Sequence, residues 1–214
     1  MKRSKFKFPS AYLQEMAKKR YIQISGSEDG WDKIVDNISN SIDPRCEYII
    51  FSRDEIFPSG NTITISGETF HCDLFENMPE EIIGDIAVYA MTVGDVKEDN
   101  SGILEETLID IALTAYIDAM RDTLRSEFQE EYIVSGSMAP GIEGMPVEEI
   151  QIIDKLLDLY AIGISLNDHM TMIPQKSAAG LFMFFREEHP VNTNSCATCM
   201  ARGKGCDFCV VGKE

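Results

Sequence analysis

The 214-residue sequence lacks the features that mark several large protein classes. No segment approaches the ~20 consecutive apolar residues that a membrane-spanning helix needs. Histidine occurs only three times, at distant positions, and never in a helical zinc motif. Glycine-rich phosphate loops, GxGxxG turns and nucleophile-elbow serines are also absent from the sequence. We therefore expect neither a membrane protein nor a common nucleotide-binding or serine-hydrolase fold.

Positive charge is scarce, with 19 lysines and arginines against 36 acidic residues and a formal net charge of −17. Seven of the basic side chains lie in the first twenty residues, so the rest of the chain is strongly acidic. An acidic body repels phosphate backbones, which argues against a nucleic-acid partner. Residues 1–8 are basic but lack the apolar run of a secretory signal, so we expect a cytoplasmic, reducing location.

A hydrophobic content of 44% can supply a sizeable core, and hydrophobic periodicity predicts both helices and strands. Helices are expected at residues 10–19, with Ser10 as the cap, and at 31–42, 101–130 and 146–159. Strands are expected at residues 47–52, 62–66, 69–74, 86–92, 131–135, 169–174 and 180–186, with a tight hairpin at Gly67-Glu68. Helices and strands come in mixed order along the chain, and some of the strands are joined by hairpins. This order predicts an α+β fold with a mainly antiparallel, twisted sheet and flanking helices. We place this domain at residues 1–187 and a cysteine-rich tail at 188–214.

The tail is the most informative segment, because it holds two close cysteine pairs. They are Cys196 and Cys199, then Cys206 and Cys209. Each pair can turn both thiolates toward one ion, and four thiolates complete a tetrahedral shell. Zinc or an iron–sulfur cluster fits this spacing; a disulfide-paired or redox-switched tail and unliganded thiols are the alternatives. The isolated Cys46 and Cys72 carry no ligand spacing and are expected to be core thiols.

Polar residues on the long helix and a glycine-rich loop are the other candidate site features. Asp110, Thr114 and Asp118 recur at every fourth position beside the apolar stripe. The simpler interpretation of this line is a solvated edge. Residues 135–144 contain three glycines and a proline, which expose backbone groups and allow a ligand to approach closely.

Several segments, taken in order, resemble the activation domain of cobalamin-dependent methionine synthase, in the stand-alone form that some bacteria carry. They are Thr92-Val-Gly94, residues 109–118 of the long helix, Ala139-Pro-Gly141, residues 162–168 and residues 172–177 with Gly180. Their order and spacing match that family over roughly residues 65–185. The cysteine-rich tail also resembles the tail of many stand-alone members.

This resemblance implies a non-Rossmann α+β domain that binds S-adenosylmethionine. The expected partner is a cobalamin-carrying methionine synthase that lacks its own activation domain. A flavodoxin- or ferredoxin-like protein would reduce the oxidised cobalt, which then takes the methyl group from the sulfonium. The domain itself would contribute positioning, while the cofactors supply the reactivity. Two alternatives remain: a corrinoid redox activator with an iron–sulfur centre on the tail, and an interaction module ordered by a zinc knuckle.

The resemblance also assigns roles to residues. Asp118, with Asp110 and Thr114, would meet the positively charged groups of the ligand. The loop that would contact its methionine and ribose parts consists of Ser137, Met138, Ala139, Pro140, Gly141 and Ile142. The family usually has an arginine where Ser137 stands and a tyrosine where Ile142 stands. A lost bidentate arginine contact is worth roughly 1.5–3 kcal/mol, and Lys176 is the candidate to replace it.

Overall fold

In the computed structural model of the chain, the described residues are 2–96, 102–135, 137–142 and 144–187. Their centre is a five-stranded sheet in which every neighbouring pair is antiparallel. The strands, in spatial order, are β1 (Lys2–Phe6), β2 (Arg45–Phe51), β6 (Ile83–Thr92), β10 (Ser177–Phe185) and β7 (Ile133–Val134). The expected α+β class with a mainly antiparallel sheet is confirmed. The division at residue 187 stays a prediction, since the tail lies outside the described residues.

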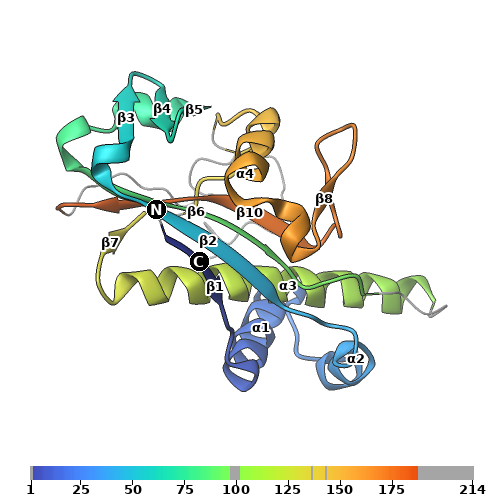
Figure 1. Cartoon of the computed structure of the whole chain (residues 1–214). Helices are drawn as coiled ribbons and strands as arrows, with labels where there is room; N and C mark the ends of the chain where they lie inside the picture. Colours follow the sequence, from blue (N-terminus) through green and yellow to red (C-terminus); the bar gives the residue numbers. More distant parts are fainter. Residues whose placement is uncertain (1, 97–101, 136, 143, 188–214) are drawn as a thin grey trace.

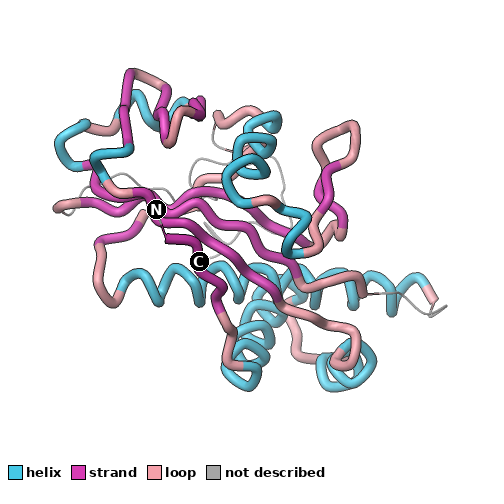
Figure 2. The backbone as a smooth tube through the Cα atoms, viewed as in Figure 1, coloured by secondary structure: helices cyan, strands magenta, loops and turns pink. Residues whose placement is uncertain are grey.

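The sheet separates two layers (Figures 1 and 2). One face is covered by α1 (Ser10–Ser25), α2 (Trp31–Ile38) and α3 (Ile103–Gln129). The other face carries α4 (Ile150–Leu157) and a smaller sheet of β3 (Ile56–Ser59), β4 (Thr62–Ile65) and β5 (Glu68–His71). A two-stranded sheet of β8 (Ser165–Leu166) and β9 (Met172–Ile173) lies beside them. Short 3₁₀ turns occupy Arg53–Glu55, Asp73–Asn77, Glu80–Ile82, Val147–Glu149 and Leu159–Ile162.

Two hydrophobic cores form because the central strands are apolar on both faces. Successive side chains of a strand point to opposite faces. On β10, Phe182 and Phe184 therefore pack with α1–α3, whereas Leu181 and Met183 pack with α4 and the small sheet. β6 alternates in the same way, which explains why these two strands are almost continuous hydrophobic runs.

Several element boundaries differ from the sequence prediction. The first helix is longer than expected: it ends at Ser25, where Gly26 adopts a left-handed φ of 78°. Ser10 is its first residue and not its cap, because Pro9 occupies that position without a side-chain cap. The second helix ends at Ile38, and the turn between β4 and β5 is Ser66-Gly67, both with positive φ. That geometry suits a two-residue hairpin, so the predicted hairpin is confirmed one residue earlier.

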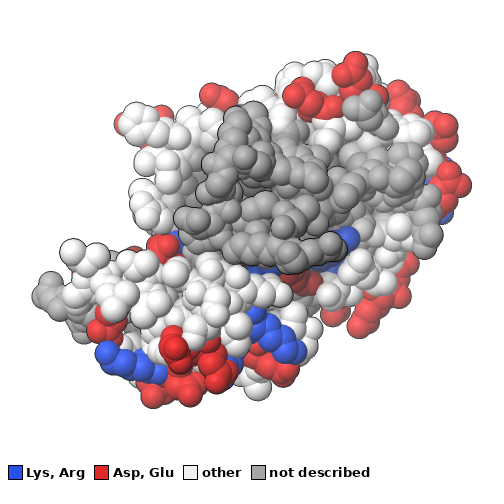
Figure 3. All heavy atoms as spheres, turned by 180° about the vertical axis from the view of Figure 1, so that it is seen from behind, with Lys and Arg blue, Asp and Glu red and all other residues white. Residues whose placement is uncertain are grey.

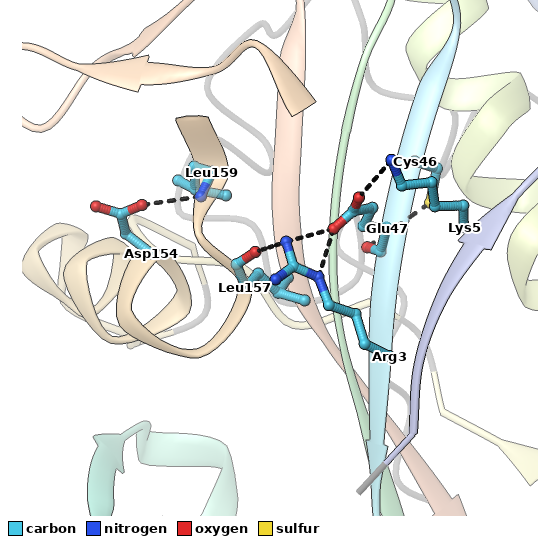
Figure 4. Close-up of polar contacts among 7 residues, drawn as sticks. All are labelled: Arg3, Lys5, Cys46, Glu47, Asp154, Leu157 and Leu159. Atoms are coloured by element: carbon cyan, nitrogen blue, oxygen red, sulfur yellow. Dashed lines mark hydrogen bonds and ion pairs between the residues drawn. The ribbon is translucent and has the colours of Figure 1, made fainter. Parts of the chain in front are cut away.

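A buried carboxylate ties the edge strand β1 to the rest of the fold (Figure 4). Glu47 of β2 is only 2% exposed and accepts a 2.6 Å hydrogen bond from Nε of Arg3. Lys5 lies 3.3 Å away, on the other carboxylate oxygen. Arg3 also donates to the carbonyl of Leu157, the last residue of α4. One arginine therefore holds together β1, β2 and the end of α4.

The two isolated cysteines lie in the core, as expected from the sequence. Cys46 packs in the α1–α3 core and Cys72 in the core on the other face. Burial raises the pKa of the Cys46 thiol far above its ordinary value, so almost no reactive thiolate forms at neutral pH.

We therefore expect iodoacetamide at pH 8 to leave Cys46 and Cys72 unmodified in the native protein. Both should be alkylated within minutes after unfolding in guanidinium chloride, which serves as the control. Peptide mapping by mass spectrometry distinguishes them from the tail cysteines. Modification of Cys46 at equal rates in the native and unfolded protein would contradict this expectation.

Candidate functional site

The loop that carries the resemblance to an adenosyl-ligand site is anchored along β10. Met138 forms an isolated antiparallel bridge with Leu181, through backbone hydrogen bonds of 3.0 and 2.8 Å. Gly141 adopts a φ of 83° and donates to the carbonyl of Met145, so the loop closes on itself as a tight turn. Gly141 and Ile142 are left exposed at its tip. The chain thus presents a hydrogen-bonded backbone turn toward solvent.

The start of the loop is joined to the sheet through Tyr89. The hydroxyl of this β6 residue lies 2.5 Å from the hydroxyl oxygen of Ser137. Its ring is buried and stacks on Phe182, with the ring centroids 4.8 Å apart. Burial raises the pKa of Tyr89, and the nearby charge of Arg121 partly opposes that rise. Tyr89 therefore joins Ser137 to the hydrophobic core beneath α1–α3.

Asp118 belongs to an ion-pair cluster between α1 and α3. Its Oδ2 accepts a 2.9 Å hydrogen bond from Nε of Arg20, and its Oδ1 accepts a 2.6 Å bond from Nη2 of Arg121. The Asp118 side chain is 18% exposed. One helical turn after Arg121, Arg125 donates to the carbonyls of Val134 and Ser135, just before the loop. The interpretation as a solvated edge is wrong for Asp118, which is held in place by two arginines.

Asp110 and Thr114 of α3 form a second polar cluster with Lys176, which precedes β10. Nζ of Lys176 lies 2.7 Å from Oδ1 of Asp110 and 2.9 Å from the Thr114 hydroxyl. Asp110 and Asp118 are separated by about 12 Å along the helix axis, from the rise of ~1.5 Å per residue. The structure thus joins Lys176 to Asp110 and Thr114, whereas Asp118 is paired with the arginines.

The motif segments around Lys176 lie side by side. The carbonyl of Lys176 accepts a hydrogen bond from the backbone N–H of Val93, and the hydroxyl of Ser177 bonds that of Thr92. Gly94, with a φ of 86°, donates to the same threonine hydroxyl. The segments 92–94 and 172–177, distant in sequence, therefore form one end of the β6–β10 pair.

Sequence reasoning missed three members of the site: Arg20, Tyr89 and Arg121. Arg121 follows Asp118 by three positions on a helix, a spacing that could have revealed the pair. Arg20 and Asp118 are 98 residues apart, and no local pattern connects them. Tyr89 sits within an apolar strand and resembles an ordinary core residue.

The four-cysteine metal site falls on Cys196, Cys199, Cys206 and Cys209, outside the described residues, and it stays a prediction. Within the described ranges, no three or more histidine, cysteine or acidic residues are grouped to hold a metal ion. The same part of the chain contains no helix with the length and hydrophobicity to cross a membrane.

Acidic side chains gather along the lower and right-hand margins of the face opposite to that of Figure 1 (Figure 3). Basic side chains on this face lie in small, separate groups. The distribution on this face agrees with the excess of acidic residues in the sequence.

Among solved structures, the fold is similar to that of a crystal structure described as the MetH reactivation domain bound to AdoHcy, which is S-adenosylhomocysteine. The TM-score is 0.63 at 14% sequence identity, over 97% of this chain and 87% of that chain. No protein-family model matches the sequence, and no curated protein matches it. At this identity the likeness establishes the fold, and it confirms the architecture that the motif resemblance implied.

Proposed function

We propose that this chain is a reactivation module for a cobalamin-dependent methionine synthase and binds S-adenosylmethionine as the methyl donor. One observation carries the proposal: α3 bonds Asp118 through Arg121 and, one turn later, holds the backbone just before the 137–142 loop through Arg125. The fold around them is that of a domain solved with S-adenosylhomocysteine.

The chemistry of the site suits such a ligand. S-Adenosylmethionine carries a positive sulfonium and an ammonium group, and a carboxylate such as Asp118 favours both. The exposed turn at Gly141 would offer backbone groups to the uncharged parts of the ligand. The sulfonium methyl comes with the ligand, and the nucleophilic cobalt comes with the partner's corrinoid. The role of this chain is to hold the methyl donor in one orientation, which lowers the entropic part of the barrier.

The partners proposed for this function are a methionine synthase without its own activation domain and a flavodoxin- or ferredoxin-like electron donor. The large acidic excess of the body would favour a complementary basic face on the synthase. The proposal needs no metal on this chain, so a zinc or iron–sulfur centre on the tail would be an addition to it.

The experiment that tests the function is anaerobic titration calorimetry of S-adenosylmethionine and S-adenosylhomocysteine into the purified chain. We expect saturable one-to-one binding of both ligands. Asp118→Asn should weaken it by about ten- to a hundredfold, the value of a charge-assisted contact. Asp110→Asn is the matched control on the same helix. Because Asp110 is 59% exposed and lies in the Lys176 cluster, its loss should change affinity less than threefold. An absence of binding heat at millimolar ligand would contradict the proposed function.

A further inference from the structure

The chain that leaves the 137–142 loop, residues 144–149, lies against the small sheet, and we call it the return arm. The backbone N–H of Asp73, just after β5, donates to the carbonyl of Gly144 at 3.4 Å. A Cβ at Gly144, which has a φ of 77°, would stand 2.6 Å from the Cβ of Asp73. Figure 1 shows β5 beside the start of α4, where the return arm ends. The loop therefore has a second support besides its bridge to β10.

The return arm is bonded directly to the tip of the loop. The carbonyl of Met145 accepts a 2.9 Å hydrogen bond from the N–H of Gly141, and the N–H of Met145 donates to the carbonyl of Ile142 at 3.0 Å. The Met145 side chain is buried in the core shared by α4 and the small sheet. A shift of the return arm therefore also moves the exposed turn at Gly141.

Glu149, at the end of the return arm, has a buried carboxylate that His71 holds at one oxygen. The Glu149 side chain is 8% exposed, and its Oε1 lies 2.8 Å from Nδ1 of His71. The backbone N–H of His71 donates to the same oxygen at 3.2 Å. Oε2 is buried and has no hydrogen-bond partner among the described residues. Because a buried carboxylate is costly without donors, the position of Glu149 depends on His71.

A second ion pair joins the same two elements at a place away from the loop. Nζ of Lys155 on α4 lies 2.8 Å from Oε2 of Glu68, the first residue of β5. Lys155 follows Glu149 by six residues, which is about 9 Å along a helix axis. Both pairs connect β5 to α4, but only the pair of His71 and Glu149 lies on the return arm.

We propose that His71 is a positioning residue for the adenosyl-ligand site. By holding Glu149 it fixes the return arm and, through the backbone of Met145, the turn at Gly141. The inference rests on the proposed function, which assigns the ligand to this loop. His71 acts through Glu149 and needs no contact with the ligand. Ligand affinity therefore depends on a contact between the small sheet and the start of α4.

The test combines amide hydrogen exchange with calorimetric titration of S-adenosylhomocysteine into the same full-length variants. His71→Phe keeps a ring of similar size and removes the donor. We expect about tenfold faster exchange in peptides that cover residues 139–147 and about three- to tenfold weaker binding. The loss of affinity is moderate because the His71 side chain is 54% exposed and solvent screens the pair.

Two further single variants separate positioning from general packing. His71→Asn can still donate to Glu149, so its loop exchange and ligand affinity should stay within about threefold of the wild type. Lys155→Gln is the matched control, because it breaks the other link between β5 and α4. It should change loop exchange and affinity by less than about twofold.

A double variant tests whether the effect passes through the buried charge. Glu149→Gln in the His71→Phe background should recover part of the slow loop exchange, because no unpaired carboxylate remains. A His71→Phe protein that folds only together with Glu149→Gln would demonstrate the same coupling.

The outcomes distinguish this inference from the proposed function. Unchanged loop exchange in His71→Phe, or equal acceleration in His71→Phe and Lys155→Gln, would overturn the positioning role. Faster loop exchange with full ligand affinity would overturn it as well. If the wild-type chain binds no ligand, the proposed function fails, and the exchange data still decide whether His71 holds the return arm.

Discussion

Replacing Gly180 by alanine should destabilise the protein by about 2–3 kcal/mol and abolish measurable binding of S-adenosylhomocysteine. A Cβ at this position would lie far inside van der Waals contact of the Met138 carbonyl oxygen. Because that oxygen belongs to the backbone, no side-chain rotation can relieve the overlap. The bridge between Met138 and Leu181 would open, and the 137–142 loop would leave β10. Stability and ligand binding are therefore expected to fall together.

Urea unfolding followed by circular dichroism, with ligand titration on the same samples, measures both effects. Gly102→Ala is the matched control, because a Cβ there meets no atom within 4 Å and the residue has a negative φ. We expect that control to change stability by less than about 0.5 kcal/mol. Equal unfolding midpoints for the two variants would show that the loop adapts to the added carbon.

The second large effect is expected from Arg3→Met. This change removes the closest cation from the buried Glu47 carboxylate and one donor from the end of α4. Loss of one partner of a buried pair costs about 3–5 kcal/mol. Since the Arg3 side chain is 40% exposed, solvent reduces that value, and we expect about 2–3 kcal/mol from thermal or urea unfolding.

A double-mutant cycle separates the buried charge from lost packing. Glu47→Leu in the Arg3→Met background should recover part of the stability, because no unpaired carboxylate remains in the core. Lys5→Met is the matched single control: the Lys5 side chain is 76% exposed and its amine lies 3.3 Å from the same carboxylate. It should cost less than about 1 kcal/mol. Strict additivity of Arg3→Met and Glu47→Leu would show that the pair is not coupled.

The parts of the fold that follow a strong local pattern could be predicted from the sequence. The 27-residue helix α3 was expected within two residues at each end, because its apolar stripe continues over seven turns. β1 was missed, since its alternating basic residues read as a polar terminus and become a strand only by pairing with β2. β3 contains Pro58, which lowers strand propensity, and it occurs at the edge of the small sheet.

The candidate site also has residues that the sequence predicts and residues that only the structure reveals. The motif order pointed to Asp118 and the 137–142 loop; the structure bonds Asp118 to Arg20 and Arg121, and Ser137 of the loop to Tyr89. The partners that give Asp118 its geometry were not predictable, because Arg20 reaches it across two helices. Lys176 was a reasonable replacement for a missing cation, yet its amine is bonded to Asp110 and Thr114. Local chemistry thus identified candidate residues, and tertiary packing determined which of them are joined.

The place of β10 in the sheet has a consequence for synthesis on the ribosome. β6 pairs with β10 from Thr92↔Ser177 to Ile83↔Phe185, and β7 joins the sheet only through β10 in the described residues. At about 5–20 residues per second, the ~85 residues between the two strands delay this pairing for several seconds. During that delay the nascent chain carries β6 with an unpaired apolar edge, which is a site for aggregation or chaperone binding. Translation speed through residues 93–176 is therefore expected to govern the yield of soluble protein.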